Sequence, residues 1–239
     1  MKITPLVIDT TDPWNLDRTP LDGVAVVIDL FRATSSIQIL VDRGFLVRPR
    51  RNPSEVHAGQ CHLVGEWYQA TDVSFTCGNS PIKLLGLFSS KEPVEFVSSN
   101  GSGALFAASV ARRTFCGSLF NIQALTELLA AIGEPVHLIP AGRRGDRRLE
   151  DDFTALMIAE RLSFLKECVF TERLNNLHAA INGTNIQDLM LSPGATFVSE
   201  SGDGPDLEFI LSGRYKSTVI PEFRNNLIKP ADAAAQPVA

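Results

Sequence analysis

The sequence has no long apolar run, little net charge and no closely spaced cysteine pair. A membrane-spanning helix needs about 20 apolar residues, so we expect no membrane span. The formal net charge of −5, without a long basic run, argues against nucleic acid as a partner. Asp9, Asp12 and Asp17 interrupt any signal-peptide core, and the four scattered cysteines fit reduced thiols. These absences predict a cytoplasmic globular protein.

Familiar phosphate- and nucleotide-binding motifs are missing too. The chain has no P-loop, and Gly101-Ser-Gly103 does not continue into a dinucleotide fingerprint. Cysteine phosphatases require Arg six residues after the nucleophile, but Cys77 is followed there by Lys83 and Cys61 by Trp67. The four histidines show no metal-binding spacing. What remains is a metal-assisted site without a cysteine or histidine nucleophile.

The sequence does contain five apolar segments that each end in a short loop of small or polar residues, with a helix-like stretch after the loop. Ligands of open α/β sheets bind just beyond the carboxyl ends of the strands. Helix N-termini add unpaired amides and a positive dipole end there, which favours an anion such as phosphate. The segments are Val24–Leu30, Ser74–Cys77, Val94–Ser98, Thr114–Cys116 and Val136–Ile139.

Strand and helix patterns alternate as far as about Leu165, which predicts an α/β fold with a mainly parallel sheet and helices on both faces. A length of 239 residues with 44% hydrophobic content fits a single large domain, 1–239. Beyond Leu165 we expect helices over 167–182, 186–191 and 206–211 and a short strand, Thr218–Ile220. The Ala-rich residues 230–239 are predicted to be a flexible tail.

Asp29 and Arg32 close the first strong strand. An Asp in this place can bind a metal or attack phosphorus, and an Arg three residues later can bind phosphate oxygens in a bidentate manner. The alternative is an Asp that caps the next helix and pairs with the Arg. The Asp-x-Asp motif of haloacid-dehalogenase phosphatases is not present, because Phe31 stands in the place of the second acid.

Three further loops carry small polar residues that either cap a helix or present amides to an anion. Each signal is weak alone, and the functional interpretation depends on their joint position after strands. The residues are Asn79 and Ser80 in Gly78-Asn-Ser-Pro, Asn100 and Gly101 in Ser99-Asn-Gly-Ser, and Ser118 and Asn121 in Gly117-Ser-Leu-Phe-Asn.

Acidic and basic residues cluster around the last loop. Glu150 and Asp151 open a helix, where acids are favoured by the helix dipole but can also bind Mg²⁺ through oxygen. Of the four arginines that precede them, we expect one, Arg143, to bind an anion and the others to be solvated. Glu66 follows another apolar run and is either a third metal-binding acid or an ordinary surface residue.

Five of these motifs together resemble the 2-phosphosulfolactate phosphatase (ComB-like) family. Their order and approximate spacing match through Leu21–Arg161, and a weaker similarity follows at Asp206-Leu-Glu-Phe and Val219-Ile-Pro. The motifs are Val27-Ile-Asp-Leu-Phe-Arg-Ala-Thr-Ser-Ser-Ile, Gly78-Asn-Ser-Pro, Ser99-Asn-Gly-Ser, Ser118-Leu-Phe-Asn and Pro140-Ala-Gly followed by Leu149-Glu-Asp-Asp.

The resemblance implies a Mg²⁺-dependent phosphoric monoester hydrolase that converts 2-phosphosulfolactate, or a similar phosphorylated 2-hydroxy acid, to sulfolactate and phosphate. Sulfolactate is then a product in its own right or an intermediate of coenzyme M biosynthesis. On this interpretation the metal and acid–base residues are Asp29, Glu66, Glu150 and Asp151, phosphate is bound by Arg32 and Arg143, and polar contacts come from Asn79, Ser80, Asn100, Gly101, Ser118 and Asn121. Whether the chain forms a homo-oligomer stays open.

The chain departs from the family pattern at three positions. Thr76 replaces an acid before Gly-Asn-Ser-Pro, Trp67 replaces an Arg after the Gly-Glu pair, and Gly103 replaces the Arg of Asn-Gly-Thr-Arg. Loss of an acid and two arginines changes the charge of any site that they share. The alternative to an enzyme is therefore a catalytically impaired relative that binds a small anionic metabolite.

Overall fold

The apolar segment Val24–Ile28 forms strand β2 in the computed structural model, and all of its residues are buried. Successive side chains of a strand point to opposite faces of the sheet. Ala25 and Val27 belong to one hydrophobic cluster, whereas the other three residues of the strand belong to a second cluster. Both faces of β2 are therefore covered, as a central strand requires.

The structure describes residues 5–16, 21–56, 61–66, 75–86, 92–143 and 145–232. These residues form a single α/β domain around a ten-stranded sheet with the strand order β4-β5-β3-β10-β9-β6-β2-β7-β1-β8. The other strands are β1 (Leu6–Thr10), β3 (Val47–Arg50), β4 (His62–Gly65), β5 (Val94–Val97), β6 (Arg113–Gly117), β7 (Val136–Pro140), β8 (Cys168–Phe170), β9 (Pro221–Arg224) and β10 (Leu227–Pro230).

The hairpin β9–β10 joins two parallel halves of the sheet. Strand β10 pairs antiparallel with β3, and β9 pairs antiparallel with β6. Within each half the strands are parallel: one half consists of β4, β5 and β3, and the other of β6, β2, β7, β1 and β8. Its turn residues, Asn225 and Asn226, have φ values of 53° and 59°. Two positive φ values in a two-residue turn suit the twist of a hairpin.

This turn yields a stability prediction. Asn226→Val should lower the free energy of unfolding by about 1–2 kcal/mol, because a β-branched residue is strained at a left-handed φ. Asn226→Gly, which removes the same side-chain amide without that strain, should be neutral or slightly stabilising. Urea unfolding of the three proteins measures the difference, and equal midpoints for the Val and Gly variants would contradict the prediction.

Helices cover both faces of the sheet, as the sequence predicts. Helices α1 and α3 contribute to the hydrophobic cluster that contains Ala25, and α4, α5 and α6 contribute to the cluster that contains Val24. The α-helices are α1 (Ala33–Asp42), α2 (Pro81–Gly86), α3 (Gly101–Ala108), α4 (Ile122–Ile132), α5 (Leu149–Leu165), α6 (Glu172–Ala180), α7 (Pro193–Val198) and α8 (Gly204–Leu211).

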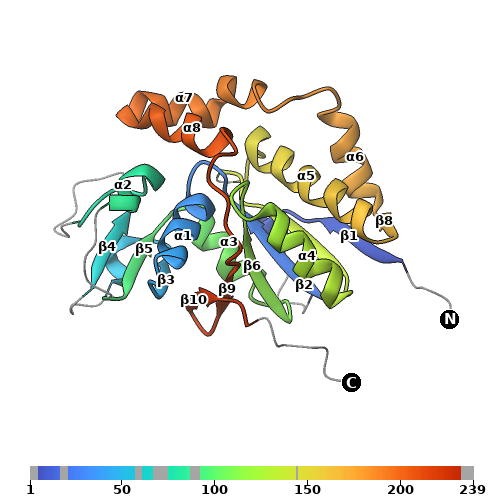
Figure 1. Cartoon of the computed structure of the whole chain (residues 1–239), viewed down its shortest axis with the longest axis horizontal. Helices are drawn as coiled ribbons and strands as arrows, with labels where there is room; N and C mark the ends of the chain where they lie inside the picture. The colour runs from blue at the N-terminus through green and yellow to red at the C-terminus, as the bar shows by residue number, and fades with distance from the viewer. Residues whose placement is uncertain are drawn as a thin grey trace.

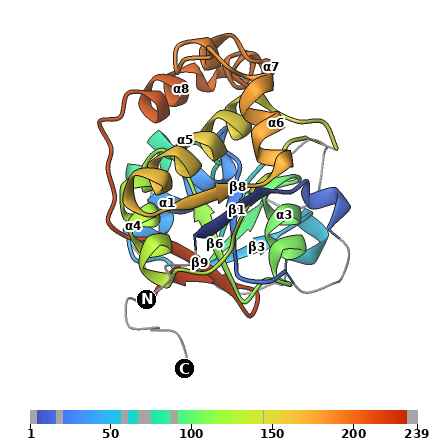
Figure 2. The same cartoon turned by 90° about the vertical axis from the view of Figure 1, so that its right-hand side faces the viewer.

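The last two helices lie together beyond one end of the sheet, in the upper part of Figures 1 and 2. A π-helical turn, η4 (Ser199–Asp203), joins α7 to α8. We call residues 193–211 the C-terminal cap. Helix α8 contacts α2, and Phe197 and Gly194 of α7 line a pocket together with residues from the loops that follow the strands. The cap therefore lies on the edge where the sequence predicts the site.

The second half of the chain differs from the predictions in detail. Residues 218–220 form no strand, and the strands there are β9 and β10, which were not predicted. The stretch predicted as a helix over 167–182 begins with strand β8. In the first half, β1 was not predicted, and Cys77 makes only an isolated bridge to Val64, with Ser74 outside the described residues.

Two further predictions concern the membrane and the C-terminus. Among the helices of the described residues, none combines the length and the apolar character that a membrane crossing demands. Of the tail predicted over 230–239, Pro230 is the last residue of β10, and residues 233–239 lie outside the part of the chain that the structure describes.

Candidate active site

One pocket brings together loops from distant parts of the sequence. The free space between its walls, which is open to solvent at the mouth, amounts to about 450 Å³. Loops at the carboxyl ends of β2, β4, β5 and β7 contribute to its wall, and so does the C-terminal cap. The lining residues are Asp29, Phe31, Glu66, Asn100, Gly142, Arg143, Arg148, Glu150, Asp151, Gly194 and Phe197.

Asp29 lies at the N-termini of two helices. Its Oδ1 atom accepts a hydrogen bond from the amide of Ala33, the first residue of α1, at 3.2 Å, and the amide of Gly101 at the start of α3 also stabilises the carboxylate. Burial, and after it the charges of Glu66 and Glu150, outweigh these amides and raise the pKa of Asp29 from 3.8 to about 7. Asp29 therefore changes its protonation state near neutral pH.

Asp151 connects two of the loops. Its Oδ1 atom accepts a hydrogen bond from the Leu30 amide at 2.8 Å, and its Oδ2 atom accepts one from the Gly142 amide at 3.0 Å. Burial and the charges of Asp29 and Glu150 raise the pKa of Asp151 well above its usual value. This carboxyl group therefore holds the loop after β2 and the loop after β7 in a fixed relation.

Glu150 lies against the cap. A Cβ atom at Gly194 would come within 1.8 Å of Glu150 Oε1, so only glycine leaves room for this carboxylate. The Oε2 atom is buried and has no hydrogen-bond partner among the described residues. Burial raises the pKa of Glu150. A buried carboxylate oxygen without a protein donor needs a partner, and a water molecule or a cation would suit it.

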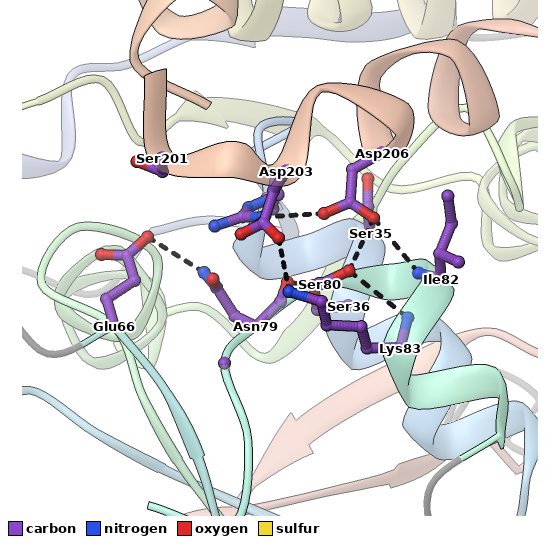
Figure 3. A network of polar contacts seen from close by, with 12 residues as sticks. Ser35, Ser36, Glu66, Asn79, Ser80, Ile82, Lys83, Ser201, Asp203 and Asp206 are labelled. Carbon is purple, nitrogen blue, oxygen red and sulfur yellow. Dashed lines mark hydrogen bonds and ion pairs between the residues drawn. The ribbon is translucent and has the colours of Figure 1, made fainter. Parts of the chain in front are cut away.

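Glu66, after β4, reaches the same pocket from the opposite half of the sheet. Its Oε1 atom accepts a hydrogen bond from Asn79 Nδ2 at 3.0 Å, and the Ser99 hydroxyl lies 3.5 Å from Oε2 (Figure 3 shows the Asn79 contact). Asn79, predicted to contact the substrate, therefore orients a pocket carboxylate and is itself almost fully buried.

The four predicted metal-binding acids, Asp29, Glu66, Glu150 and Asp151, all line this pocket. They do not form a preformed metal shell, because no group of three Asp, Glu, His or Cys side chains within the described ranges has that geometry. Asp29 nevertheless interacts electrostatically with each of the other three. The arrangement is a cluster of four carboxyl groups around a shared cavity, in which Asp29, Glu150 and Asp151 are buried and Glu66 is partly exposed.

The predicted arginine cluster divides into different roles. Arg143 lies 4.8 Å above the ring of Phe197, and it lines the pocket together with Arg148. Arg147 instead forms a two-atom ion pair with Asp152, with contacts of 2.9 and 2.6 Å. Arg144 lies outside the described residues. Two cations therefore face the carboxylate cluster across the pocket, where one was expected.

Arg32 does not line the pocket. Its guanidinium Nη1 atom contacts Asp203 Oδ2 at 2.6 Å and Asp206 Oδ2 at 2.7 Å, and both acids belong to the cap. Asp29 does bond to the first amide of the next helix, as the alternative interpretation proposed, but the ion-pair partners of Arg32 are Asp203 and Asp206. The structure thus gives Arg32 a contact with the cap in place of a position in the pocket wall.

Of the remaining predicted polar residues, some lie at the pocket and others bond elsewhere. Asn100 lines the pocket, and the amide of Gly101 faces Asp29. The Ser80 hydroxyl donates to Asp206 at 2.8 Å. Ser118 and Asn121 bond to their own turn, because the Asn121 side chain accepts from the Ser118 amide and donates to the Cys116 carbonyl. Neither of these two lines the pocket.

Gly194, Phe197, Asp203 and Asp206 complete the site and its surroundings, yet sequence reasoning assigned none of them a role there. Their segment shows no strand-end pattern, and only Asp206 carried a signal, as part of the weak similarity at Asp206-Leu-Glu-Phe. Gly194 and Phe197 reach the pocket through the position of the cap, whereas Asp203 and Asp206 contact Arg32, about 170 residues earlier in the sequence.

The three departures from the family pattern do not share one location. Gly103 lies on α3 with Trp14 as its nearest neighbour, at 3.9 Å from where a Cβ atom would stand. Thr76 is exposed, and its hydroxyl accepts a hydrogen bond from the Leu63 amide. Trp67 lies outside the described residues. Neither Gly103 nor Thr76 lines the pocket with Asp29.

The fold and the pocket define an α/β protein with acids and arginines gathered at the carboxyl edge of its sheet. A sequence profile described as 2-phosphosulpholactate phosphatase matches residues 10–226. The chain therefore belongs to the 2-phosphosulfolactate phosphatase family.

The similar proteins share only a modest part of their sequence with this chain. A "Probable 2-phosphosulfolactate phosphatase" of Symbiobacterium thermophilum is 32% identical over 59% of this chain and 64% of its own length, which is less than two thirds of that relative. Proteins of the same description from Thermus thermophilus and Caldanaerobacter subterraneus are 27% and 24% identical, over 85% and 94% of this chain and 89% and 98% of their own lengths.

Proposed function

We propose that this protein is a Mg²⁺-dependent phosphatase that hydrolyses a phosphorylated 2-hydroxy acid, such as 2-phosphosulfolactate, to the hydroxy acid and phosphate. One observation carries the proposal. Four carboxyl groups and two arginines, Arg143 and Arg148, line a single pocket at the carboxyl edge of the sheet. A phosphoester dianion bound there would meet cationic side chains on one side and metal-binding oxygens on the other.

The acids fit a hard cation. Glu150 Oε2 is buried without a hydrogen-bond partner among the described residues, and the pKa values of Asp29, Glu150 and Asp151 are raised. Mg²⁺ is commonly held by one or two carboxylates together with water and substrate phosphate, so it does not need a preformed cage. Asp29, Glu66 and Glu150 would hold it, and when bound it would polarise phosphoryl oxygens.

The chain's own residues supply the other parts of the reaction. Arg143 and Arg148 bind the nonreacting oxygens of phosphate or the acidic end of the substrate. Asp29 either accepts a proton from the attacking water or attacks phosphorus itself, and in both routes the bond between phosphorus and the substrate's hydroxyl oxygen breaks and that oxygen takes up a proton. In the second route water then hydrolyses the aspartyl phosphate and releases phosphate. Mass spectrometry of a quenched reaction distinguishes the routes, because only the second leaves phosphate on Asp29.

The test is release of inorganic phosphate from 2-phosphosulfolactate and from phospholactate. We expect turnover of at least one of these with Mg²⁺ and its loss, by about 100-fold or more, after chelation, since metal-assisted phosphoryl transfer loses several kcal/mol of stabilisation without the ion. A phosphomonoester of a simple secondary alcohol, such as isopropyl phosphate, serves as the control for selectivity because its leaving oxygen is of the same kind. It should react more slowly, because it lacks the carboxylate that one of the two arginines would bind.

The opposite outcome would favour the binding protein that the sequence left open. Thermal stabilisation by sulfolactate or phosphate without Mg²⁺, with no phosphate release from any phosphoester, would contradict the proposed enzyme. Rapid hydrolysis that survives chelation would retain the phosphatase but contradict its metal dependence.

A further inference from the structure

A network of ion pairs and hydrogen bonds joins the C-terminal cap to the rest of the molecule (Figure 3). Arg32 contacts Asp203 at 2.6 Å and Asp206 at 2.7 Å. Lys83 Nζ contacts the other oxygen of Asp203 at 2.7 Å, and the Ser80 hydroxyl donates to Asp206 Oδ1 at 2.8 Å. Arg32 in the loop after β2, Ser80 just before α2 and Lys83 on α2 thus contact two acids of the cap.

This network, which we call the latch, consists of Arg32, Ser80, Lys83, Asp203 and Asp206. Its centre is buried, because the side chain of Asp206 is 1% exposed and that of Arg32 is 8% exposed. Removal of one partner of a buried ion pair leaves a charge without compensation, which is far more costly than the loss of a surface pair. The latch is therefore a strong constraint on the position of the cap.

The apolar contacts of the cap lie at its two helices and not in its middle. Ala195, Val198 and Leu207 form a small hydrophobic cluster, against which Phe31 of the β2–α1 loop packs. Ile210 near the end of α8 reaches the larger cluster of the main domain. The middle of the cap, where η4 joins the two helices, has no buried residue of its own. At that point the latch acids provide the contacts to the main domain.

The position of the cap matters because two of its residues form the pocket wall. Gly194 packs directly against the carboxylate of Glu150, and the ring of Phe197 lies 4.8 Å from the guanidinium of Arg143. A cation above an aromatic face is held most firmly when the pair is desolvated. A shift of the cap would therefore displace an acid and an arginine of the pocket together.

We propose that the latch sets the pocket geometry by fixing the cap, so that Asp206 and Arg32 are positioning residues that act through Gly194 and Phe197 without touching the substrate. This inference rests on the proposed function for its effect on turnover. Its structural part, the dependence of the cap on Asp206, does not rest on any activity.

The first experiment compares Asp206→Asn with the native protein by hydrogen–deuterium exchange at a pH where both are folded. We expect amides of residues 193–211 to exchange about tenfold faster or more, with those of β2 and β6 unchanged, because local opening tracks the loss of local contacts. In turnover assays KM should rise about tenfold or more while kcat changes less, since the pocket wall that binds the anion is loosened.

Glu222→Gln is the matched control. Glu222 also forms a buried pair, with Arg113, whose side chains are 9% and 10% exposed, but this pair joins β9 to β6 away from the pocket. This variant removes a buried charge of the same sign and should leave exchange of 193–211 and KM unchanged. An equal effect of Glu222→Gln on both readouts would overturn the proposal, since general destabilisation would then explain them.

Two other results would also overturn it. Exchange of 193–211 in Asp206→Asn that equals the native rate would show that the latch does not hold the cap. Faster exchange with unchanged KM and kcat would show that the cap does not position the pocket. If the native protein hydrolyses no phosphoester, the proposed function fails, and the affinity for inorganic phosphate replaces KM. A drop of about tenfold in that affinity would still support the latch.

Discussion

Asp29→Asn should abolish phosphate release and at the same time make the metal-free protein more stable at pH 8. We expect kcat to fall by about 1,000-fold or more, because the variant loses both a metal-binding oxygen and the base or nucleophile. The gain in stability follows from the position of the carboxyl group, which is buried beside Glu66 and Glu150. An amide there carries no charge to be repelled or desolvated.

The pKa of Asp29 is raised from its reference value of 3.8 to about 7 in the folded protein. This shift sets the sign of the pH dependence of stability. Between these values the folded state holds a proton that the unfolded state has lost. Stability therefore falls as pH rises from about 4 to about 7 and is flat above, which is the reverse of a salt-bridged acid. About three pKa units correspond to at most roughly 4 kcal/mol, part of it shared with neighbouring acids.

Thermal unfolding of the metal-free proteins at pH 5, 6, 7 and 8 measures this effect. The difference in Tm between Asp29→Asn and the native protein should grow from pH 5 to about pH 7 and then level off. Mg²⁺ should stabilise the native protein more than the variant at pH 8. Glu127→Gln is the control, because it removes an exposed acid from α4 and should not alter the pH profile. A variant that is uniformly less stable than the native protein would contradict the raised pKa.

A second large effect is expected at Gly101, the first residue of α3. A Cβ atom there would lie 2.5 Å from Ala33 Cβ and 2.8 Å from Asp29 Oδ2, so the loop after β2 and α3 approach too closely for alanine. Gly101→Ala should lower the free energy of unfolding by about 1–3 kcal/mol, as overpacking does in a dense core. It should also displace Asp29 and reduce kcat/KM by about 100-fold.

Gly103→Ala on the same helix provides a direct control. The nearest atom to its added Cβ would be the Trp14 ring at 3.9 Å, an ordinary contact. Alanine favours the helix over glycine by about 1 kcal/mol, so this variant should be slightly more stable and fully active. If Gly101→Ala and Gly103→Ala behaved alike in urea unfolding and in turnover, close packing of Gly101 against Asp29 could not be the reason for glycine at that position.

The sequence predicted the pocket best where a strand end and a polar loop coincide. Asp29 and Glu66 directly follow strands, and Asn100 lies in the loop after β5. Arg143 lies in the loop after β7, and Glu150 lies at the start of α5, to which that loop leads. The carboxyl ends of parallel strands lie at one edge, so local patterns were sufficient to bring these residues together. The same reasoning predicted the α/β fold and both covered faces of the sheet.

Local patterns did not predict the roles of Arg32, Ser118 and Asn121. Each is a polar residue after a strand, and we expected Arg32 to bind phosphate and the other two to make polar contacts with the substrate. Arg32 is bonded to Asp203 and Asp206, and Asn121 closes its own turn by bonding to Ser118 and Cys116. A polar side chain bonds to the groups that the fold places beside it. The groups beside Arg32 are Asp203 and Asp206, and their segment has no strand-end pattern.

The sequence by itself determined the strands and the loops that carry the acids, because apolar periodicity and loop composition are local and hydrophobic burial acts on them directly. Only the tertiary structure decided that hairpin β9–β10 joins two parallel halves and that the C-terminal cap closes the pocket with Gly194 and Phe197. It also decided that Asp29 is buried among like charges, which sets its pKa. These properties depend on distances between residues far apart in the chain, and charge–charge and packing energies change steeply with such distances.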